Sequence, residues 1–477
     1  MDDMPGTARS LTRITRSDRD FDRLRRGWNQ RFQANPFEVV LPTDTREVSL
    51  ALQDARDRGL PVRIRSGGHS VDGFSAADDA VVIDLRSLDG IDIDPDAKYA
   101  EVGAGARIHA VYESLAAHGR VIPGGVSHTV GMGGFITGGG LGTLARWLGA
   151  MAHNVAEFDI VDARGDIRRV TPQREPDLYW ACLGAGGGNF GVITKFVLRL
   201  TPMPTAVWFR LSWPWNHFEA VYDAWQRWAP SADPRLTPFL AMWPTTTANR
   251  IDVGGLFPGT EEELAGLLAP LFDLGPAPAE REVTVTTFTA AMSALLQKIA
   301  DDSFDSSTRA VTASPFFAEP LSHDVFGALR ESHVGPPGNS FVWCLPGGGQ
   351  LTAAADRGTE SFAHGRAHHL MLIRSDWSDP RDDEACTSWA GSLYRHVSHR
   401  ATGAYLNWTN TDIEARPQLF YGDNFPRLVE TKHRYDPDGV FDFDNGIPAS
   451  VSLRQAQRLA LPDTMVAELR SRGRLVE

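Results

Sequence analysis

The chain has 477 residues, of which 42% are hydrophobic and 22% are charged. These values are ordinary for a globular protein, and the length exceeds that of one ordinary core, so two domains are expected. The formal net charge of −13 and the absence of a Lys/Arg block argue against nucleic acid or an anionic membrane as partner.

The first clear elements lie between residues 41 and 119. Asp44 and Glu47 have the spacing of a capping box, and apolar residues then repeat at helical intervals until Gly59, which predicts a helix over 45–58. Short strands are expected at 61–65, 80–85 and 99–103, and an amphipathic helix is expected at 108–118.

A very glycine-rich stretch follows at 122–149, and a hairpin is predicted around Arg164–Asp166. Residues 177–202 read as a short helix, a glycine run and a long strand. From about residue 204 the glycines give way to strand-like runs such as 206–213 and 368–377, which alternate with helical runs such as 261–275. This change of character predicts a second α+β domain.

Three glycine clusters precede residue 192, which is more glycine than turns alone require. Glycine permits positive φ and close approach of backbone to a ligand, and the N–H groups of such loops bind anions. A large flat ligand with a diphosphate fits this pattern. A Rossmann fold is the simplest alternative, but the glycines are spread over about 120 residues instead of one strand–loop–helix unit.

The ordered motifs "RSGGHS", "VGAGA", "PGGVSHTVGMGG", "TGGGLG", "GAGGGNFGVIT" and the tail "YGDNFPRL…YDPDGVF" resemble those of the berberine-bridge-enzyme-like flavoprotein oxidases. These belong to the vanillyl-alcohol-oxidase-type FAD superfamily. The resemblance covers about 36–202 and 405–448. It implies an α+β fold with a two-lobed PCMH-type FAD-binding domain at 1–203 (core 36–203). It also implies a middle α+β substrate domain at 204–403, in which helices cover an antiparallel sheet. The C-terminal segment at 404–477 is expected to return to the FAD domain.

His69 falls at the position of the family's covalent histidine, so the resemblance implies a bond from its ring to the flavin. The plain alternative is a histidine that only hydrogen-bonds its loop. Many relatives form a second bond from a cysteine, but Ser127 stands in that place here, and serine is a poor nucleophile without an activating base. We therefore expect FAD held by a single covalent bond.

The resemblance implies that the diphosphate lies on the backbone N–H groups of "SGGHS" and "VSHTVGMGG". Val130 matches a position over the flavin where oxidases of the family carry valine, which favours an oxidase, although ordinary packing would also explain a valine. The residues expected to contact FAD are Arg65, Ser66, Gly67, Gly68, His69, Ser70, Gly73, Gly125, Val126, Ser127, Thr129, Val130, Gly131, Gly133, Gly134, Gly138, Gly139, Gly142, Asn154, Val155, Gly191, Val192, Ile193, Tyr405 and Asn407.

Tyr405 and Asn407 match the family's Y-x-N element beside the flavin. The resemblance implies that Tyr405 removes a proton from substrate while Asn407 orients the flavin or the substrate. An ordinary tyrosine has a pKa of about 10, so its surroundings would have to lower it, and a packing role is the alternative. His128, next to Ser127, is a second acid/base candidate or a loop hydrogen-bonder.

Relatives often carry an acid or glutamine on a middle-domain strand, but the matching position here falls near Leu372. This departure leaves the base assignment open. His369 and Arg374 on the same strand are possible substitutes, or solvated and packing residues. The tryptophans between 208 and 243 either line an aromatic pocket or belong to the core.

These features lead us to expect an FAD-dependent oxidase that takes a hydride from an alcohol, amine or activated C–H substrate and passes the electrons to molecular oxygen, giving hydrogen peroxide. Tailoring of a secondary metabolite is the expected setting. The alternatives are a carbohydrate or amine oxidase, a dehydrogenase with another acceptor, an oxygenated-flavin monooxygenase, and a flavoprotein that only sequesters a ligand.

No metal-ligand pattern is present, and no nucleic-acid or membrane partner is expected. The three cysteines are widely spaced and form no CxxC pair, which indicates a reducing compartment. The N-terminus lacks the apolar stretch of a secretory signal. We therefore expect a cytoplasmic protein, and the sequence leaves its oligomeric state open.

Overall fold

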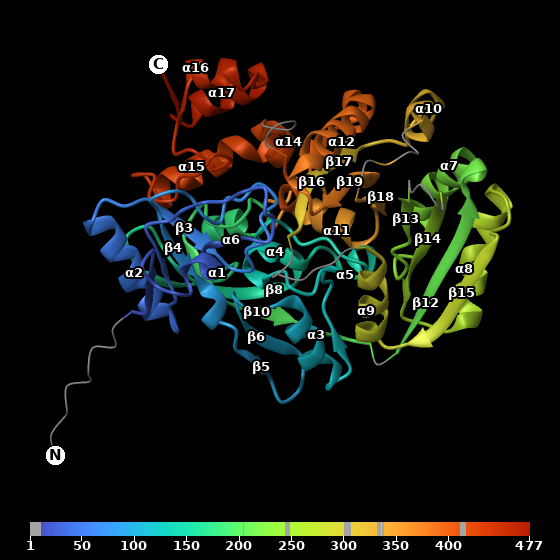
Figure 1. Ribbon diagram of the computed structural model, residues 1–477, viewed down its shortest axis with the longest axis horizontal. Helices are drawn as coiled ribbons and strands as arrows, with labels where there is room; N and C mark the ends of the chain where they lie inside the picture. The colour runs from blue at the N-terminus through green and yellow to red at the C-terminus, as the bar shows by residue number, and fades with distance from the viewer. Residues whose placement is uncertain are drawn as a thin grey trace.

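The computed structural model describes residues 11–203, 205–243, 249–299, 307–331, 335, 338–410 and 416–477. Helices and antiparallel or mixed sheets are interleaved along it, so the expected α+β class is confirmed (Figure 1). No helix in these ranges is long and apolar enough to cross a membrane.

The first sheet has four strands, in the order β1 (Arg13–Thr15), β2 (Glu38–Val40), β4 (Val81–Asp84) and β3 (Val62–Arg65). The last three are parallel, as expected where a helix makes the crossover. That helix, α2 (Thr45–Asp57), begins where the Asp44 carboxylate accepts a hydrogen bond from Glu47 N at 2.8 Å. The reciprocal half of the predicted capping box is wrong, because the Glu47 carboxylate binds Thr43 N and Oγ1 instead.

The second sheet is antiparallel, in the order β5 (Ile91–Ile93), β6 (Tyr99–Gly103), β10 (Val192–Arg199), β8 (Val155–Val161) and β9 (Ile167–Val170). The expected hairpin at Arg164–Asp166 is the β8–β9 connection. The glycine-rich stretch at 122–149 runs beside this sheet and contains only short helices. The helices of this region are α3 (Ile108–Ala116), α4 (Met132–Thr137), α5 (Ala145–Leu148) and α6 (Pro176–Cys182).

The third sheet is large and antiparallel, and its strands come from the middle of the chain. Its order is β15 (Glu280–Thr286), β12 (Ala206–Pro214), β14 (Arg250–Phe257), β13 (Phe239–Trp243), β18 (Asn339–Pro346), β19 (His369–Trp377), β17 (Pro315–Phe317) and β20 (Gly403–Ala404), with β16 (Arg309–Ala313) also paired to β19.

One face of this sheet packs against four helices and the other faces the glycine-rich half of the chain (Figure 1). The covering helices are α7 (Phe218–Trp228), α8 (Glu261–Leu274), α10 (His323–Glu331) and α12 (Asp383–Val397). Trp213, Trp225 and Trp228 lie in the helix-side core, whereas Trp208 and Trp243 belong to the core on the other face.

The C-terminal segment crosses back over the first half of the chain, where α15 (Phe425–Tyr435) lies close to α6 (Figure 1). The buried ammonium of Lys432 donates to Asn189 O and Phe441 O, both at 2.7 Å, and pairs with Asp436 at 2.6 Å. A buried charge of this kind is stable only when fully paired, so this network fixes the segment against the glycine loop at 184–191.

The other elements are short or peripheral. They are α1 (Phe21–Arg25), β7 (Arg120–Val121), β11 (Thr201–Pro202), α9 (Phe288–Ile299), α11 (Gln350–Arg357), α14 (Pro417–Tyr421), β21 (Val451–Ser452), α16 (Leu453–Arg458), α17 (Asp463–Ser471) and β22 (Leu475–Val476). The boundaries expected at 203 and 403 stay predictions. The strand β20 lies across the second of them and pairs with β17.

Candidate cofactor and active site

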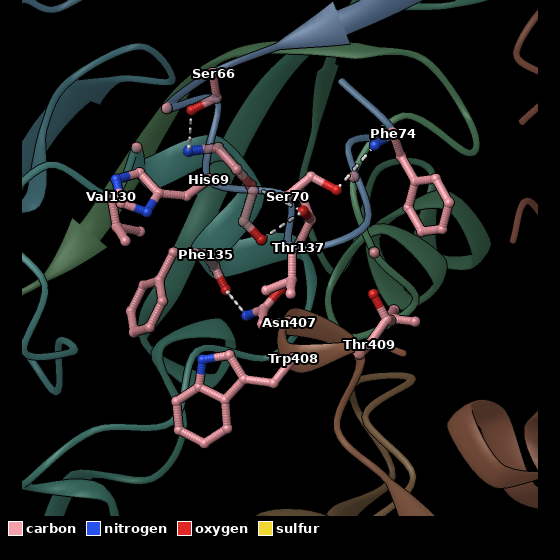
Figure 2. A pocket seen from close by; sticks show the side chains of 18 of the residues that line it. Ser66, His69, Ser70, Phe74, Val130, Phe135, Thr137, Asn407, Trp408 and Thr409 are labelled. Atoms are coloured by element: carbon pink, nitrogen blue, oxygen red, sulfur yellow. Dashed lines mark hydrogen bonds between the residues drawn. The ribbon is translucent and has the colours of Figure 1, made fainter. Parts of the chain in front are cut away.

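A large cavity lies where the three sheets and the C-terminal segment meet (Figure 2). Its walls come from the loop after β3, the glycine-rich stretch, the loop at 185–191, the strands β16, β18 and β19, and residues 405–409. The residues expected to contact FAD that line it are Ser66, Gly67, Gly68, His69, Ser70, Gly125, Val126, Ser127, Val130, Gly131, Gly133, Gly134, Gly142, Gly191, Ile193, Tyr405 and Asn407.

Two of the glycine loops touch each other through backbone. A Cβ on Gly67 would lie 2.1 Å from the nitrogen of Gly131, and a Cβ on Gly131 would lie 2.3 Å from the nitrogen of Gly67. Any side chain at either position would force the loops apart. The guanidinium of Arg107 donates to Gly67 O at 2.6 Å and to Thr129 O, so one partly buried cation joins both loops.

His69 stands on the first of these loops, with its ring inside the protein. Its Nε2 lies 2.6 Å from Thr129 Oγ1, and its ring stacks on Trp28 at 5.2 Å between centroids. Burial, with the nearby charges of Arg107 and Arg374, holds the pKa of His69 well below its ordinary value. The imidazole is therefore neutral at pH 7, which is the form that has a nucleophilic lone pair.

Tyr405 and Asn407 lie together on the turn that follows β20. The Tyr405 hydroxyl accepts hydrogen bonds from Leu141 N at 2.8 Å and from Asn407 Nδ2 at 3.0 Å. Asn407 also donates to Phe135 O at 3.0 Å (Figure 2). A Cβ on Gly138 would lie 2.0 Å from Asn407 Oδ1, so that glycine makes room for the amide.

The acidity of Tyr405 is set by two opposed effects. Burial raises its pKa to about 12, while the donors Leu141, Asn407 and Gly140 act in the opposite direction. Since the phenol oxygen already accepts two hydrogen bonds, its own proton is directed to a third partner. This arrangement suits proton exchange with a bound molecule.

Two catalytic candidates lie away from the cavity wall. The His128 ring stacks on His109 of α3, with centroids 4.2 Å apart. His369 is fully buried on the helix-covered face of β19, where its Nε2 lies 3.3 Å from the Tyr222 hydroxyl. Alternation along the strand places Leu372 and Arg374 on the cavity wall and His369 on the opposite face.

Several expected cofactor residues act behind the wall. Arg65 donates to the carbonyls of Leu24 and Arg25, and Asn154 donates to Leu148 O and Ala150 O. Val155 and Val192 are buried strand residues. The remaining four are Gly73, Thr129, Gly138 and Gly139, which the structure places beside Phe32, His69, Asn407 and Phe362.

Part of the cavity wall lies outside the motifs that predicted the cofactor site. Trp28 lies before the motifs, and Phe341 and Trp343 lie on β18, yet all three line the cavity. The alternation Phe341, Trp343, Leu345 within "NSFVWCLP" was the available signal for a strand with an aromatic face. Arg107 follows "VGAGA" directly, but nothing in its spacing indicates that it joins two loops.

These features fit a flavin dinucleotide. Glycine loops from both halves of the first domain present backbone that a side chain would obstruct, and a neutral histidine and a tyrosine–asparagine pair reach the same cavity. Extended ligands with phosphates are held by such backbone N–H groups. A compact pocket for one small metabolite would not need walls from so many separate segments.

Comparison with known proteins agrees with this fit. Two family models match the chain, one described as an FAD binding domain over residues 36–171 and one as berberine and berberine like over residues 404–448. An uncharacterized FAD-linked oxidoreductase of Bacillus subtilis, YgaK, is 32% identical over 441 residues, covering 91% of this chain and 96% of its own. The aclacinomycin-N/aclacinomycin-A oxidase of Streptomyces galilaeus is 27% identical over 500 residues, covering 91% and 89%.

Solved structures show the same fold. BBE-like 1 of Physcomitrella patens superposes with a TM-score of 0.84 at 24% identity, covering 92% of this chain and 97% of its own. The grass pollen allergen Phl p 4, described as having glucose dehydrogenase activity, gives 0.83 at 23% identity, covering 91% and 96%. The predicted PCMH-type architecture is thus confirmed, and the chain belongs to the berberine-bridge-enzyme-like family of FAD-linked oxidoreductases.

Proposed function

We propose that the protein is an oxidase that holds FAD through a single covalent bond from His69, oxidises a small molecule and reduces molecular oxygen to hydrogen peroxide. The observation that carries the proposal is the position of His69, which lines the cavity on the first of two glycine loops that touch each other through backbone. Bound FAD would supply the acceptor for the hydride that leaves the substrate carbon.

The residues that would hold the cofactor are those of the glycine loops, with Arg107 fixing the loops to one another. Ser127 lines the cavity where many relatives have a cysteine, and without an activating base its hydroxyl would form no second bond. The residue types present therefore support single attachment.

Tyr405 is proposed as the general base. It would take the proton of the substrate O–H as the hydride leaves, and Asn407, which donates to its oxygen, would keep it oriented. The position on β19 where relatives often carry an acid or a glutamine falls near Leu372, which lines the cavity, so this position supplies no carboxylate to share the role.

Oxygen as the acceptor is supported by Val130, a small side chain on the cavity wall. Among the solved neighbours, wild-type Phl p 4 is described as a glucose dehydrogenase and an isoleucine-to-valine variant of it as a glucose oxidase. A change of one methylene thus distinguishes the two electron acceptors in that protein. A secondary-metabolite setting is supported by the aclacinomycin oxidase relative, and three buried cysteines that form no disulfide within the described residues suit the cytoplasm.

The test is acid precipitation of the purified protein and of a His69→Ala variant, followed by the absorption spectrum and mass of each pellet. We expect one flavin per wild-type chain in the pellet and none in the variant pellet. Release of flavin from both proteins would disprove the covalent attachment, and a wild-type protein without flavin would refute the proposed function itself.

A dehydrogenase is the second candidate, since wild-type Phl p 4 is described as one. The two are separated by reducing the holoenzyme without oxygen and then mixing it with oxygenated buffer or with a dye acceptor. Fast reoxidation by oxygen supports the oxidase, and reoxidation by the dye alone supports the dehydrogenase.

A further inference from the structure

The geometry points to an aromatic substrate that is neutral or anionic, and against a protonated amine or a sugar. This inference rests on the proposed function and narrows its substrate class. It follows from the charges that line the cavity, from the side chains on the wall formed by β16, β18 and β19, and from the position of one arginine.

The described part of the cavity wall carries no acidic side chain. Among its lining residues within the described ranges there is no Asp and no Glu, while Arg63 and Arg374 supply positive charge. Arg63 lies toward the C-terminal segment and donates to Asp442 O at 2.5 Å. A protonated amine entering this space would lose its hydration without finding a carboxylate, and it would meet another cation.

Arg374 is held in one orientation. Its Nε donates to both carboxylate oxygens of Asp376, at 2.8 and 3.0 Å. Its guanidinium lies over the ring of Trp28 at 5.0 Å and that of Phe341 at 5.8 Å. Because these contacts use Nε and the flat faces, the two Nη atoms have the geometry to bind a carboxylate, phenolate or carbonyl oxygen of a ligand.

Arg374 is also close to His69. It stands two residues beyond Leu372 on the same face of β19, and its charge contributes to the low pKa of His69. Asp376 is not among the lining residues, so the ligand would meet the cation and not its counter-ion.

The other lining side chains of β18 and β19 are aromatic and aliphatic. Phe341, Trp343 and Leu345 on β18 and Leu372 on β19 line the cavity. Phe341 packs on Trp243 at 5.5 Å and Trp343 on Phe239 at 5.2 Å, centroid to centroid, so the two lining rings are held by side chains of the neighbouring strand β13. Fixed rings of this kind bind a flat aromatic ligand well.

A sugar would find few partners on the same wall. Besides Arg374, the polar groups that these strands contribute are the indole N–H of Trp343 and the hydroxyl of Thr312, which already donates to Thr409 O at 3.0 Å. Several sugar hydroxyls would therefore be buried without hydrogen bonds, which is costly. The glucose activity described for Phl p 4 is accordingly not expected here.

The experiment uses the flavin-loaded protein and four probes: benzoate, benzyl alcohol, benzylammonium and glucose. Binding is followed without oxygen by the change in flavin absorbance. We expect benzoate and benzyl alcohol to bind, and benzylammonium to bind at least about 10-fold more weakly than benzoate, since a charged hydrogen bond is worth about that factor or more. Glucose should neither bind nor reduce the flavin.

Variants assign the preference to Arg374. Arg374→Gln should weaken benzoate about 10-fold or more and leave benzyl alcohol within about threefold, while Arg374→Lys should keep part of the benzoate affinity. Because Arg374→Gln removes a cation that pairs with the buried Asp376, the double variant Arg374→Gln/Asp376→Asn is the matched control for misfolding. Trp343→Leu should weaken both aromatic probes together.

Benzylammonium binding as tightly as benzoate, reduction of the flavin by glucose, or no binding by either aromatic probe would each overturn the inference. The flavin content of the same preparation, measured by acid precipitation, keeps this separate from the proposed function. A protein that carries flavin but prefers benzylammonium or glucose refutes only the substrate class.

Discussion

Replacement of Tyr405 by phenylalanine tests the proposed base directly, because it removes one oxygen and keeps the ring. That oxygen accepts from Leu141 N and from Asn407 Nδ2. The amide of Asn407 keeps its bond to Phe135 O, whereas the N–H of Leu141 is left unpaired. One buried donor without a partner costs about 1–3 kcal/mol of unfolding free energy, which a folded domain of this size tolerates.

The effect on the reaction should be larger. Loss of a positioned base slows proton transfer by about 10²- to 10⁴-fold, which corresponds to about 3 to 5.5 kcal/mol in the activation barrier. Burial raises the pKa of Tyr405 to about 12, so the deprotonated base becomes more abundant with pH throughout the accessible range. The rate of flavin reduction should therefore rise about tenfold per pH unit between pH 7 and 10 without a plateau.

The assay is stopped-flow reduction of the flavin without oxygen, at saturating substrate and several pH values. Tyr222→Phe is the matched control, since this tyrosine is equally buried but lies on the helix-covered face of the large sheet. The control should keep the wild-type slope, and Tyr405→Phe should be slow and nearly independent of pH. A Tyr405→Phe protein with the wild-type slope would refute the assignment of the base.

Four further outcomes are expected. Thr129→Val should slow covalent flavin attachment and Thr129→Ser should restore it, because Thr129 Oγ1 lies 2.6 Å from His69 Nε2. The rate is measured as pellet-bound flavin after apoprotein is mixed with FAD. Equal rates in the two variants would argue against a role for this contact. Val130→Leu should slow reoxidation by oxygen in stopped-flow mixing and leave anaerobic reduction unchanged. Burial, with the nearby Arg357, lowers the pKa of His153 to about 4, so the unfolded state takes up the proton first as pH falls below 6.5. Wild type should therefore lose about 2 kcal/mol more unfolding free energy between pH 7 and 5 than His153→Gln in urea titrations. In a His69→Ala background, Lys432→Met should weaken FAD binding by at least tenfold, because the ammonium of Lys432 joins the C-terminal segment to Asn189. An unchanged affinity for FAD would show that this hydrogen-bond network does not shape the site.

Much of the fold could be predicted because the signals are local. The helix at 45–57 follows from Asp44 as its cap and from apolar spacing, and the hairpin after β8 follows from its turn residues. The glycine motifs in their order predicted the cofactor and the family. Few ligands require the backbone to approach them closely at so many separate positions. His69 and the pair Tyr405 and Asn407 were placed at one cavity by the same resemblance, and the structure brings them there.

The sequence by itself determined that the protein has a flavin-binding site. It also determined which loops form this site and which residue types they contribute. Tertiary structure decided which side chains reach it. The strand β19 is buried on both faces, so its near-continuous apolar run gives no sign that Arg374 faces the cavity while His369 faces the helices. His128 is turned to His109 by the path of its loop, and Trp28, Phe341 and Trp343 meet from distant segments. Such choices depend on packing between elements far apart in the chain, which no local pattern encodes.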